Sequence, residues 1–182
     1  MAARLDDAAP RRLLLLRHAK AEPASAPGYE DHTRPLALRG RRQSAAVGEW
    51  LGGSAGVAVD VAYVSSALRT VQTWELLAAR LSEPAGAVLV TEDLYDAGAR
   101  DVLDLLSRTP ADARTVLVVG HEPVMSSLAA LLAGPGSDDD AVAQVRSGIP
   151  TAATCVLDVP GEWAALDRAG ATLAEVVRAV ED

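Results

Sequence analysis

The sequence contains no phenylalanine, a single cysteine and only three histidines among its 182 residues. One cysteine, Cys155, can build neither a disulfide framework nor a cysteine-based zinc site within one chain. It stands in an alternating apolar run, which favours a buried small side chain. The apolar run at residues 13–16 is too short to span a membrane, and the residues before it include Asp6 and Asp7 but no small-residue cleavage site. We therefore expect a cytoplasmic protein without a secretory signal.

Basic residues are outnumbered by acidic ones, 17 against 25, which gives a net charge of -8. Such a balance argues against a general affinity for nucleic acid or for an anionic membrane, although it permits a local basic pocket. The phosphate-binding pattern G-x-x-x-x-G-K-[ST] follows none of the apolar runs, which excludes a P-loop nucleotide-binding protein. We expect no cofactor.

Apolar runs alternate with helical patterns along most of the chain. Strands are predicted at residues 12–17, 57–64, 88–90 and 115–119, and helices at 40–50, 68–81, 100–107 and 123–132. The expected fold class is therefore α/β, a three-layer α/β/α sandwich around a mainly parallel sheet. One domain spanning residues 1–182 is expected, with a loose leader over residues 1–11.

The last third of the chain is predicted from shorter signals. A Gly/Asp-rich loop is expected at residues 134–140, two closing strands at 154–159 and 163–167 around a Pro-Gly turn, and a terminal helix at 172–180.

Histidine and arginine side chains follow three of the predicted strands directly. Arg17 and His18 end the first strand, Arg69 lies just beyond the second, and His121 follows the fourth. Ligand crevices in open α/β sheets lie beyond the carboxyl ends of the strands, so these side chains should meet there. Two of three histidines in equivalent strand-end positions is the main signal for a catalytic site.

This combination of side chains suits the transfer of a phosphoryl group. A neutral imidazole such as that of His18 is a good nucleophile towards phosphorus when one ring nitrogen is held as a donor and the other keeps its lone pair. The guanidinium groups of Arg17 and Arg69 match the phosphoryl oxygens, and His121 adds a donor beside a predicted helix start. The competing interpretation is structural: ordinary surface ion pairs and structural histidines.

Four segments around these residues closely resemble the motifs of the histidine phosphatase superfamily, also called phosphoglycerate mutase-like, and within it the SixA-type phosphohistidine phosphatases. They are LLRHAKA at 15–21, DHTRPL at 31–36 with Gly40, SSALRTVQT at 65–73 and GHEP at 120–123. The resemblance implies a phosphoglycerate mutase-like fold in which His18 becomes phosphorylated. Arg17, Arg69 and His121 would bind the phosphoryl group, and no metal would be required. Mild departures are Ala19, where glycine is commonest, and Ser66, where proline is frequent.

The resemblance also implies a general acid shortly after the third strand. Glu92, Asp93 and Asp96 stand there, and Asp96, which follows Leu-Tyr, matches the family pattern best. Since Asp96 precedes Ala-Gly, a turn-forming role is an equal alternative. In the loop at 31–36, His32 is expected to brace the loop rather than to catalyse, and Arg34 can approach the mouth of the pocket.

These observations predict a metal-independent phosphatase that acts on phosphohistidine in a protein. The sequence lacks the long insertions that could form a lid over small ligands, which favours a large substrate. The alternatives are a small-molecule phosphomonoesterase, acting on a phosphorylated metabolite such as a sugar phosphate or a nucleotide by the same mechanism, and a non-catalytic phosphate-binding module.

Overall fold

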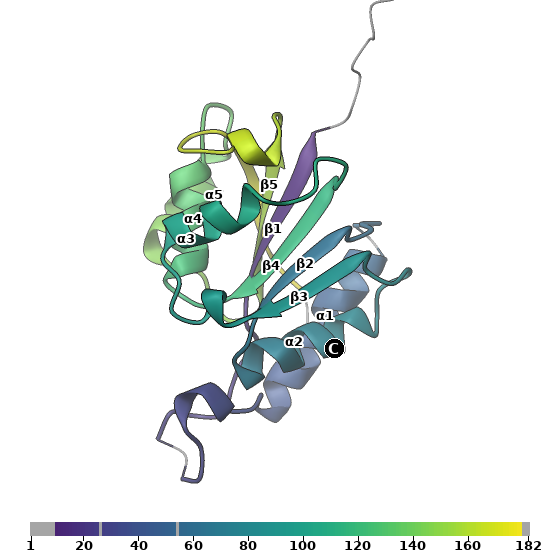
Figure 1. Ribbon diagram of the computed structural model, residues 1–182. Coiled ribbons are helices and arrows are strands. Elements are labelled where there is room, and N and C mark those ends of the chain that lie inside the picture. The colour runs from purple at the N-terminus through teal and green to yellow at the C-terminus, as the bar shows by residue number, and fades with distance from the viewer. Residues whose placement is uncertain (1–9, 26, 54, 180–182) are drawn as a thin grey trace, which may run out of the picture.

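A six-stranded sheet runs through the centre of the protein (Figure 1). The computed structural model describes residues 10–25, 27–53 and 55–179. The strands are β1 (Arg11–Arg17), β2 (Val61–Ser65), β3 (Ala87–Thr91), β4 (Thr115–Gly120), β5 (Ala153–Val159) and β6 (Thr172–Arg178). In the order β3-β2-β4-β1-β5-β6, the first four are parallel, while β5 is antiparallel to both of its neighbours. The predicted mainly parallel sheet is confirmed.

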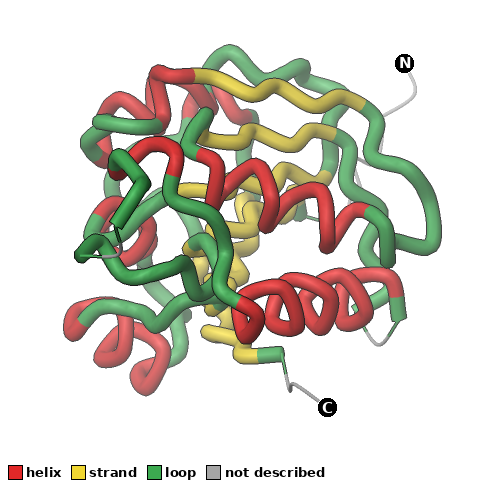
Figure 2. The backbone as a smooth tube through the Cα atoms, turned by 90° about the horizontal axis from the view of Figure 1, so that it is seen from below, coloured by secondary structure: helices red, strands yellow, loops and turns green. Residues whose placement is uncertain are grey.

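Helices cover both faces of the sheet. On one face lie α1 (Leu38–Gly52) and α2 (Leu68–Ala78), and on the other lie α3 (Ala99–Leu106), α4 (Val124–Leu132) and α5 (Asp139–Ser147). Seen from below in Figure 2, the strands lie between the helices. The three-layer α/β/α sandwich is therefore confirmed. None of the helices in the described ranges is long and apolar enough to cross a membrane.

The leucines of β1 explain why this strand lies at the centre. Leu13 and Leu15 pack into the core beneath α3, α4 and α5, whereas Leu14 and Leu16 pack into the core beneath α1 and α2. Alternate side chains of a strand point to opposite faces, so a strand covered on both faces needs an uninterrupted apolar run. All four leucines are buried, and each contributes about 1.5–3 kcal/mol relative to an exposed position.

Two of the predicted elements near the end of the chain are wrong. The stretch at 163–167 holds a 3-10 helix, Trp163–Ala165, instead of a strand, because the buried Trp163 ring turns inward and donates from Nε1 to the Ala113 carbonyl at 2.8 Å. The expected terminal helix at 172–180 is β6, since residues 172–178 complete the sheet along β5.

The structure also adds a helix and shortens the leader. α5 occupies residues that include the end of the expected 134–140 loop, and Asp138 caps it by accepting a hydrogen bond from the Ala141 amide at 2.8 Å. Residues 1–9 of the predicted leader lie outside the described residues. Arg11 is not leader but the first residue of β1, where its guanidinium donates to the carbonyls of Gly161 and Ala111.

Candidate active site

The carboxyl ends of β1, β4 and β2 lie side by side and bring the predicted residues together. Arg17 pairs with Gly120 across β1 and β4, and the His18 amide donates to the Gly120 carbonyl at 2.9 Å. The ring centroids of His18 and His121 are 5.4 Å apart. β2 lies on the other side of β4 and leads into α2, whose first turn carries Arg69. Arg17, His18, Arg69 and His121 thus share one edge of the sheet.

The His18 ring is held in one tautomer. Its Nδ1 lies 2.8 Å from the Ala19 carbonyl oxygen, which can only accept a hydrogen bond, so Nδ1 carries the proton. The lone pair is then left on Nε2. Ala19 is itself fixed, because its amide donates to Thr73 Oγ1 at 3.1 Å and that hydroxyl donates to the Arg69 carbonyl at 2.6 Å. Helix α2 therefore sets the orientation of the imidazole.

Burial keeps both histidines neutral. Desolvation lowers the pKa of His18 to about 3, with smaller contributions from the charges of His121, Arg69 and Arg17 in the same direction. Desolvation likewise lowers the pKa of His121 to about 4, assisted by Arg69. The hydrogen bond to Ala19 opposes the shift at His18 but does not offset the burial. Near neutral pH the His18 Nε2 lone pair is thus present in nearly every molecule.

His121 connects β4 to the beginning of α2. Its Nε2 lies 2.8 Å from Ser65 Oγ, and its Nδ1 lies 3.4 Å from Arg69 Nη2. A guanidinium only donates, so Nδ1 is the acceptor and the Nε2 proton points to Ser65. The contact with Arg69 is long, so Nδ1 can exchange its partner for another more easily than Nε2 can.

Arg17 is anchored through the loop before β5. Its Nη1 donates to the Ile149 carbonyl at 2.7 Å, while the Ile149 amide donates to Glu122 Oε1 at 2.8 Å. The other oxygen of Glu122 accepts from the Ser126 amide in the first turn of α4 at 3.3 Å. The Glu122 carboxylate therefore ties α4 to the loop on which the Arg17 guanidinium rests.

Arg69 is held by Asp31, a residue to which the sequence assigned no role. Nη1 donates to the Asp31 carbonyl at 2.6 Å, and Nη2 donates to Asp31 Oδ2 at 3.0 Å. Arg34 donates to the other carboxylate oxygen at 2.8 Å. Hydrogen bonds from Tyr95 and from Arg34, with the charge of Arg69, hold the pKa of Asp31 well below its usual range. Asp31 is therefore an ionised anchor at neutral pH.

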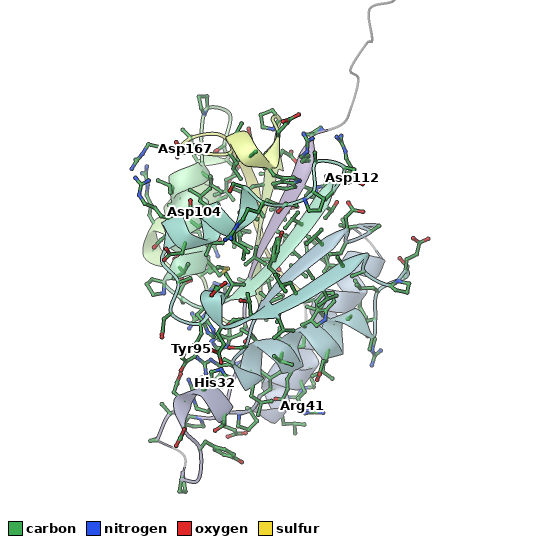
Figure 3. The ribbon with its side chains drawn as sticks, in the orientation of Figure 1. His32, Arg41, Tyr95, Asp104, Asp112 and Asp167 are labelled. Carbon is green, nitrogen blue, oxygen red and sulfur yellow. The ribbon has the colours of Figure 1, made fainter. Side chains whose placement is uncertain are left out.

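Tyr95 closes the side of the site that faces β3. Its hydroxyl donates to Asp31 Oδ2 at 2.7 Å, and this hydrogen bond raises the pKa of Tyr95. Its ring meets the edges of His121 and His32, with centroids 5.7 and 4.9 Å apart. In Figure 3, Tyr95 and His32 lie next to each other at the lower end of the sheet, far from Asp112 and Asp167 at the upper end.

Asp96 differs in position from the four residues at the strand ends. It is exposed in a bend after the 3-10 helix Glu92–Leu94, and no hydrogen bond joins its carboxylate to another described residue. Its neighbour Tyr95 points into the site instead. His32 donates or accepts one hydrogen bond with Ser66 Oγ at 3.0 Å, and Arg34 also donates to the Glu22 carbonyl at 2.7 Å. Both side chains brace the loop around Asp31.

Asp31 and Tyr95 are the site residues that sequence reasoning missed. Asp31 opens the DHTRPL segment, which lies in the sequence between the segments that carry Arg17 and Arg69. This position was the available signal. Tyr95 gave none, because a half-buried tyrosine after a strand is common in any α/β fold.

The site offers unsatisfied donors for an anion. Arg17 Nε and Arg69 Nε are buried and have no hydrogen-bond partner among the described residues, as is also true of Arg11 and Arg34. A buried donor without an acceptor costs about 1–3 kcal/mol. At Arg17 and Arg69, which flank His18, an oxyanion would supply the missing acceptors. Within the described ranges, no three His, Cys, Asp or Glu side chains are placed to share a metal ion.

Comparisons with known proteins agree with this geometry. Residues 13–98 match the model of the histidine phosphatase superfamily, branch 1. An uncharacterised protein of Mycobacterium tuberculosis is 39% identical over 87% of this chain and 96% of its own. A SixA-type protein from Nakamurella multipartitia has a TM-score of 0.80 and 35% identity, covering 95% of this chain and 98% of its own. The protein histidine phosphatase SixA in complex with tungstate has a TM-score of 0.71 and 26% identity, covering 92% and 96%.

Proposed function

Since the chain belongs to the histidine phosphatase superfamily, we propose that it removes phosphoryl groups from phosphohistidine in proteins through a covalent intermediate on His18. The observation that carries the proposal is the hydrogen bond from His18 Nδ1 to the Ala19 carbonyl at 2.8 Å. It fixes a neutral imidazole with Nε2 free, between two arginines whose Nε groups lack acceptors. This is the arrangement that a nucleophile towards phosphorus requires.

In the first step, His18 Nε2 attacks the phosphorus atom. A new N–P bond forms as the bond from phosphorus to the leaving nitrogen breaks, and the electron pair of that bond stays on the leaving imidazole. Arg17 and Arg69 balance the negative charge on the phosphoryl oxygens throughout the transfer. The SixA relative was solved in complex with tungstate, and this supports oxyanion binding by the present chain, because tungstate is a tetrahedral oxyanion like phosphate.

His121 assists once the phosphoryl group is bound. An oxyanion that takes the Arg69 Nη2 donor releases His121 Nδ1 from its 3.4 Å contact. The added negative charge favours protonation of this nitrogen, so that it too donates to the oxyanion. In the second step, water attacks the phosphorus of phosphorylated His18 and the N–P bond breaks. The electron pair of that bond returns to His18 Nε2, and the phosphate leaves with the protons of the water.

The surroundings of the leaving group favour an N-phosphoryl substrate. Asp31 is ionised by its hydrogen bonds and lacks a proton to give at neutral pH, and Asp96 is exposed. An alkoxide leaving group needs a proton from an acid, whereas an imidazole can leave carrying its own. The lack of a carboxylic acid directed at the leaving side among the described residues thus supports phosphohistidine over a phosphate ester.

Phosphate release is the direct test of this function. Purified wild-type and His18→Ala proteins are incubated, with a chelator present, with a phosphohistidine-bearing protein and with a panel of sugar phosphates, nucleotides and aryl phosphates. We expect chelator-resistant release that is fastest from phosphohistidine and is lost in His18→Ala. Faster release from one of the esters would assign the small-molecule alternative, and no release from any substrate would favour a binding module.

A further inference from the structure

A cavity, here called the basic cavity, lies along the same edge of the sheet, towards β5 and β6. It has a volume of about 540 Å³ and is lined by Lys20, Arg39, Gln43, Pro150, Thr151, Ala152, Arg178 and Ala179. β5 begins where β1 ends, and Ala153 pairs with Arg178 near the end of β6. The basic cavity therefore opens at the carboxyl edge that also carries His18.

The charge of the basic cavity is opposite to that of the whole protein. Among the described residues that line it, three carry cationic side chains and none carries an acidic one, although the chain has a net charge of -8. Lys20 lies in the loop after β1, Arg39 in α1 and Arg178 at the end of β6, and all three are exposed. Like charges gathered around one cavity repel each other, so that an anion bound between them is stabilised.

Gln43 adds a neutral donor to the basic cavity. The residue is 8% exposed, and Oε1 accepts a hydrogen bond from the Lys20 amide at 2.9 Å. Because the Lys20 amide can only donate, the facing atom is the oxygen, and the NH2 group is the other branch. That NH2 group has no partner among the described residues. The NH2 group is therefore available as a donor at the cavity wall.

Helix α1 contributes to the same potential. Its N-cap residue, Ala37, offers no side-chain acceptor, and its first turn contains no acidic residue. No acidic side chain of the first turn therefore offsets the partial positive charge at the start of α1, which lies close to Arg39.

The basic cavity is connected to the nucleophile by backbone contacts. Lys20 is two residues from His18, and the Ala152 amide donates to the carbonyls of Arg17 and His18 at 3.1 and 3.2 Å. The Lys20 carbonyl accepts from the Ala37 amide at 2.9 Å. A polypeptide that places its phosphohistidine at His18 would thus extend its neighbouring residues over the basic cavity.

We propose that the basic cavity binds carboxylate side chains of the phosphorylated protein substrate, an inference that rests on the function proposed above. A volume of about 540 Å³ exceeds what one inorganic anion fills, since a water molecule occupies about 30 Å³ of liquid. Several acidic side chains from one polypeptide segment match both this volume and the three separate cations. The cavity then selects substrates by the acidic residues next to the phosphohistidine.

Binding can be measured without turnover, because Lys20 is the only lysine of the chain. The rate of Lys20 acylation by an amine-reactive ester is followed by peptide mass spectrometry, with a phosphate-free Glu-rich peptide, its Gln-for-Glu counterpart, or inorganic phosphate present. We expect the Glu-rich peptide to slow acylation about fivefold and the Gln counterpart to have no effect. Equal rates with all additions, or protection by inorganic phosphate equal to that by the Glu-rich peptide, would overturn the assignment.

Charge-matched variants show whether the protection arises in the basic cavity. Arg39→Gln/Arg178→Gln should lose the protection, and Arg178→Gln alone should weaken it. Arg146→Gln/Arg168→Gln removes the same charge from two exposed arginines outside the cavity and should protect as wild type does. Protection that falls equally in both double variants would reduce the effect to general electrostatic attraction and overturn the proposal.

Kinetics separates this inference from the proposed function. Wild-type kcat/KM is compared for a phosphohistidine peptide with acidic flanking residues and one with their amides. We expect about a tenfold preference for the acidic peptide, falling towards unity in Arg39→Gln/Arg178→Gln. Hydrolysis of both peptides at equal rates would overturn the role of the basic cavity and leave the proposed function standing. Hydrolysis of neither would overturn the proposed function.

Discussion

At the scale of single residues, the buried histidines make the stability of the fold depend on pH. The pKa of His18 is about 3 in the folded protein against an ordinary value of 6.5. Below pH 6.5 the unfolded chain therefore binds a proton that the folded chain does not. The free energy of unfolding falls as the pH falls, by about 1.4 kcal/mol per pH unit for one such group.

We predict that His18→Asn flattens this dependence. Urea unfolding of the two proteins at several pH values between about 6 and 4 should show a shallower loss of stability in the variant, by about 1 kcal/mol per pH unit. Equal m-values would show that both proteins expose the same surface on unfolding. Parallel stability curves would contradict the burial of a neutral His18.

Asp96 can be tested as the general acid that the family resemblance implies. If it protonates the leaving group, Asp96→Asn slows aryl phosphate hydrolysis about 10²-fold or more and phosphohistidine hydrolysis much less. The exposed position of Asp96 after the 3-10 helix Glu92–Leu94 defines the competing outcome, a turn residue. An Asp96→Asn protein with wild-type rates on both substrates would remove Asp96 from the mechanism.

At the residue scale, the sequence predicted the four strand-end residues but not the groups that hold them. His18, Arg17 and His121 follow buried apolar runs, and such runs identify strand ends without coordinates. Asp31 reaches Arg69 across 38 positions, through a loop whose path no periodic pattern encodes. Side chains on loops are therefore the part of a site that sequence patterns describe least.

At the scale of elements, α1 must approach the loop after β1 closely. A side chain at Gly40 would collide with the Lys20 carbonyl, so only glycine allows this contact. We predict that Gly40→Ala destabilises the fold by about 1–3 kcal/mol. It should also lower activity, because Lys20 lies two residues after His18 and a shift of its backbone displaces the imidazole. Gly161→Ala is the control, since an added methyl group meets nothing within 4 Å there. Thermal unfolding that does not distinguish the two variants would refute this account.

The loop between α5 and β5 should depend on Glu122. Its carboxylate accepts hydrogen bonds from the amides of Ile149 and Ser126, and the Ile149 carbonyl accepts one from the Arg17 guanidinium. We predict that Glu122→Ala raises KM and lowers kcat/KM about tenfold or more by loosening Arg17, as expected when a group that positions a catalytic residue is lost. Glu122→Gln, which keeps one oxygen acceptor, should recover part of the loss. Identical kinetics of wild type and Glu122→Ala would contradict a positioning role.

Whether a segment forms a helix or a strand was predictable where its residues all favour one of the two. It was not predictable where residues that favour helices and residues that favour strands occur together. The four leucines of β1 allow only a buried strand, whereas the segment that forms β6 combines helix formers such as Leu173, Ala174 and Glu175 with Val176 and Val177. Pairing with β5, including a shift in register near Val156, decides the outcome, and that pairing is a tertiary interaction. α5 was detectable from Asp138 as an N-cap and from the spacing of Ala141 and Val145.

At the scale of the whole molecule, strand order concentrates positive charge at one edge of an acidic protein. Alternating strands and helices predicted the layers, but they do not specify that β1 lies between β4 and β5. This order places Arg69, which follows β2, on one side of the β1 terminus and the basic cavity, beside β5 and β6, on the other. The net charge of the chain disfavours contact with anionic surfaces, while this edge presents cationic side chains to an anion.

The covalent intermediate on His18 is the central claim for the whole protein. Wild-type protein is mixed with a phosphohistidine-bearing protein, the reaction is quenched in base within its first turnovers, and peptide mass spectrometry locates any phosphoryl group. The account predicts an acid-labile phosphoryl group on the peptide that contains His18, and neither this label nor turnover in His18→Ala. Turnover without a phosphoryl group on His18, or turnover retained in His18→Ala, would contradict it.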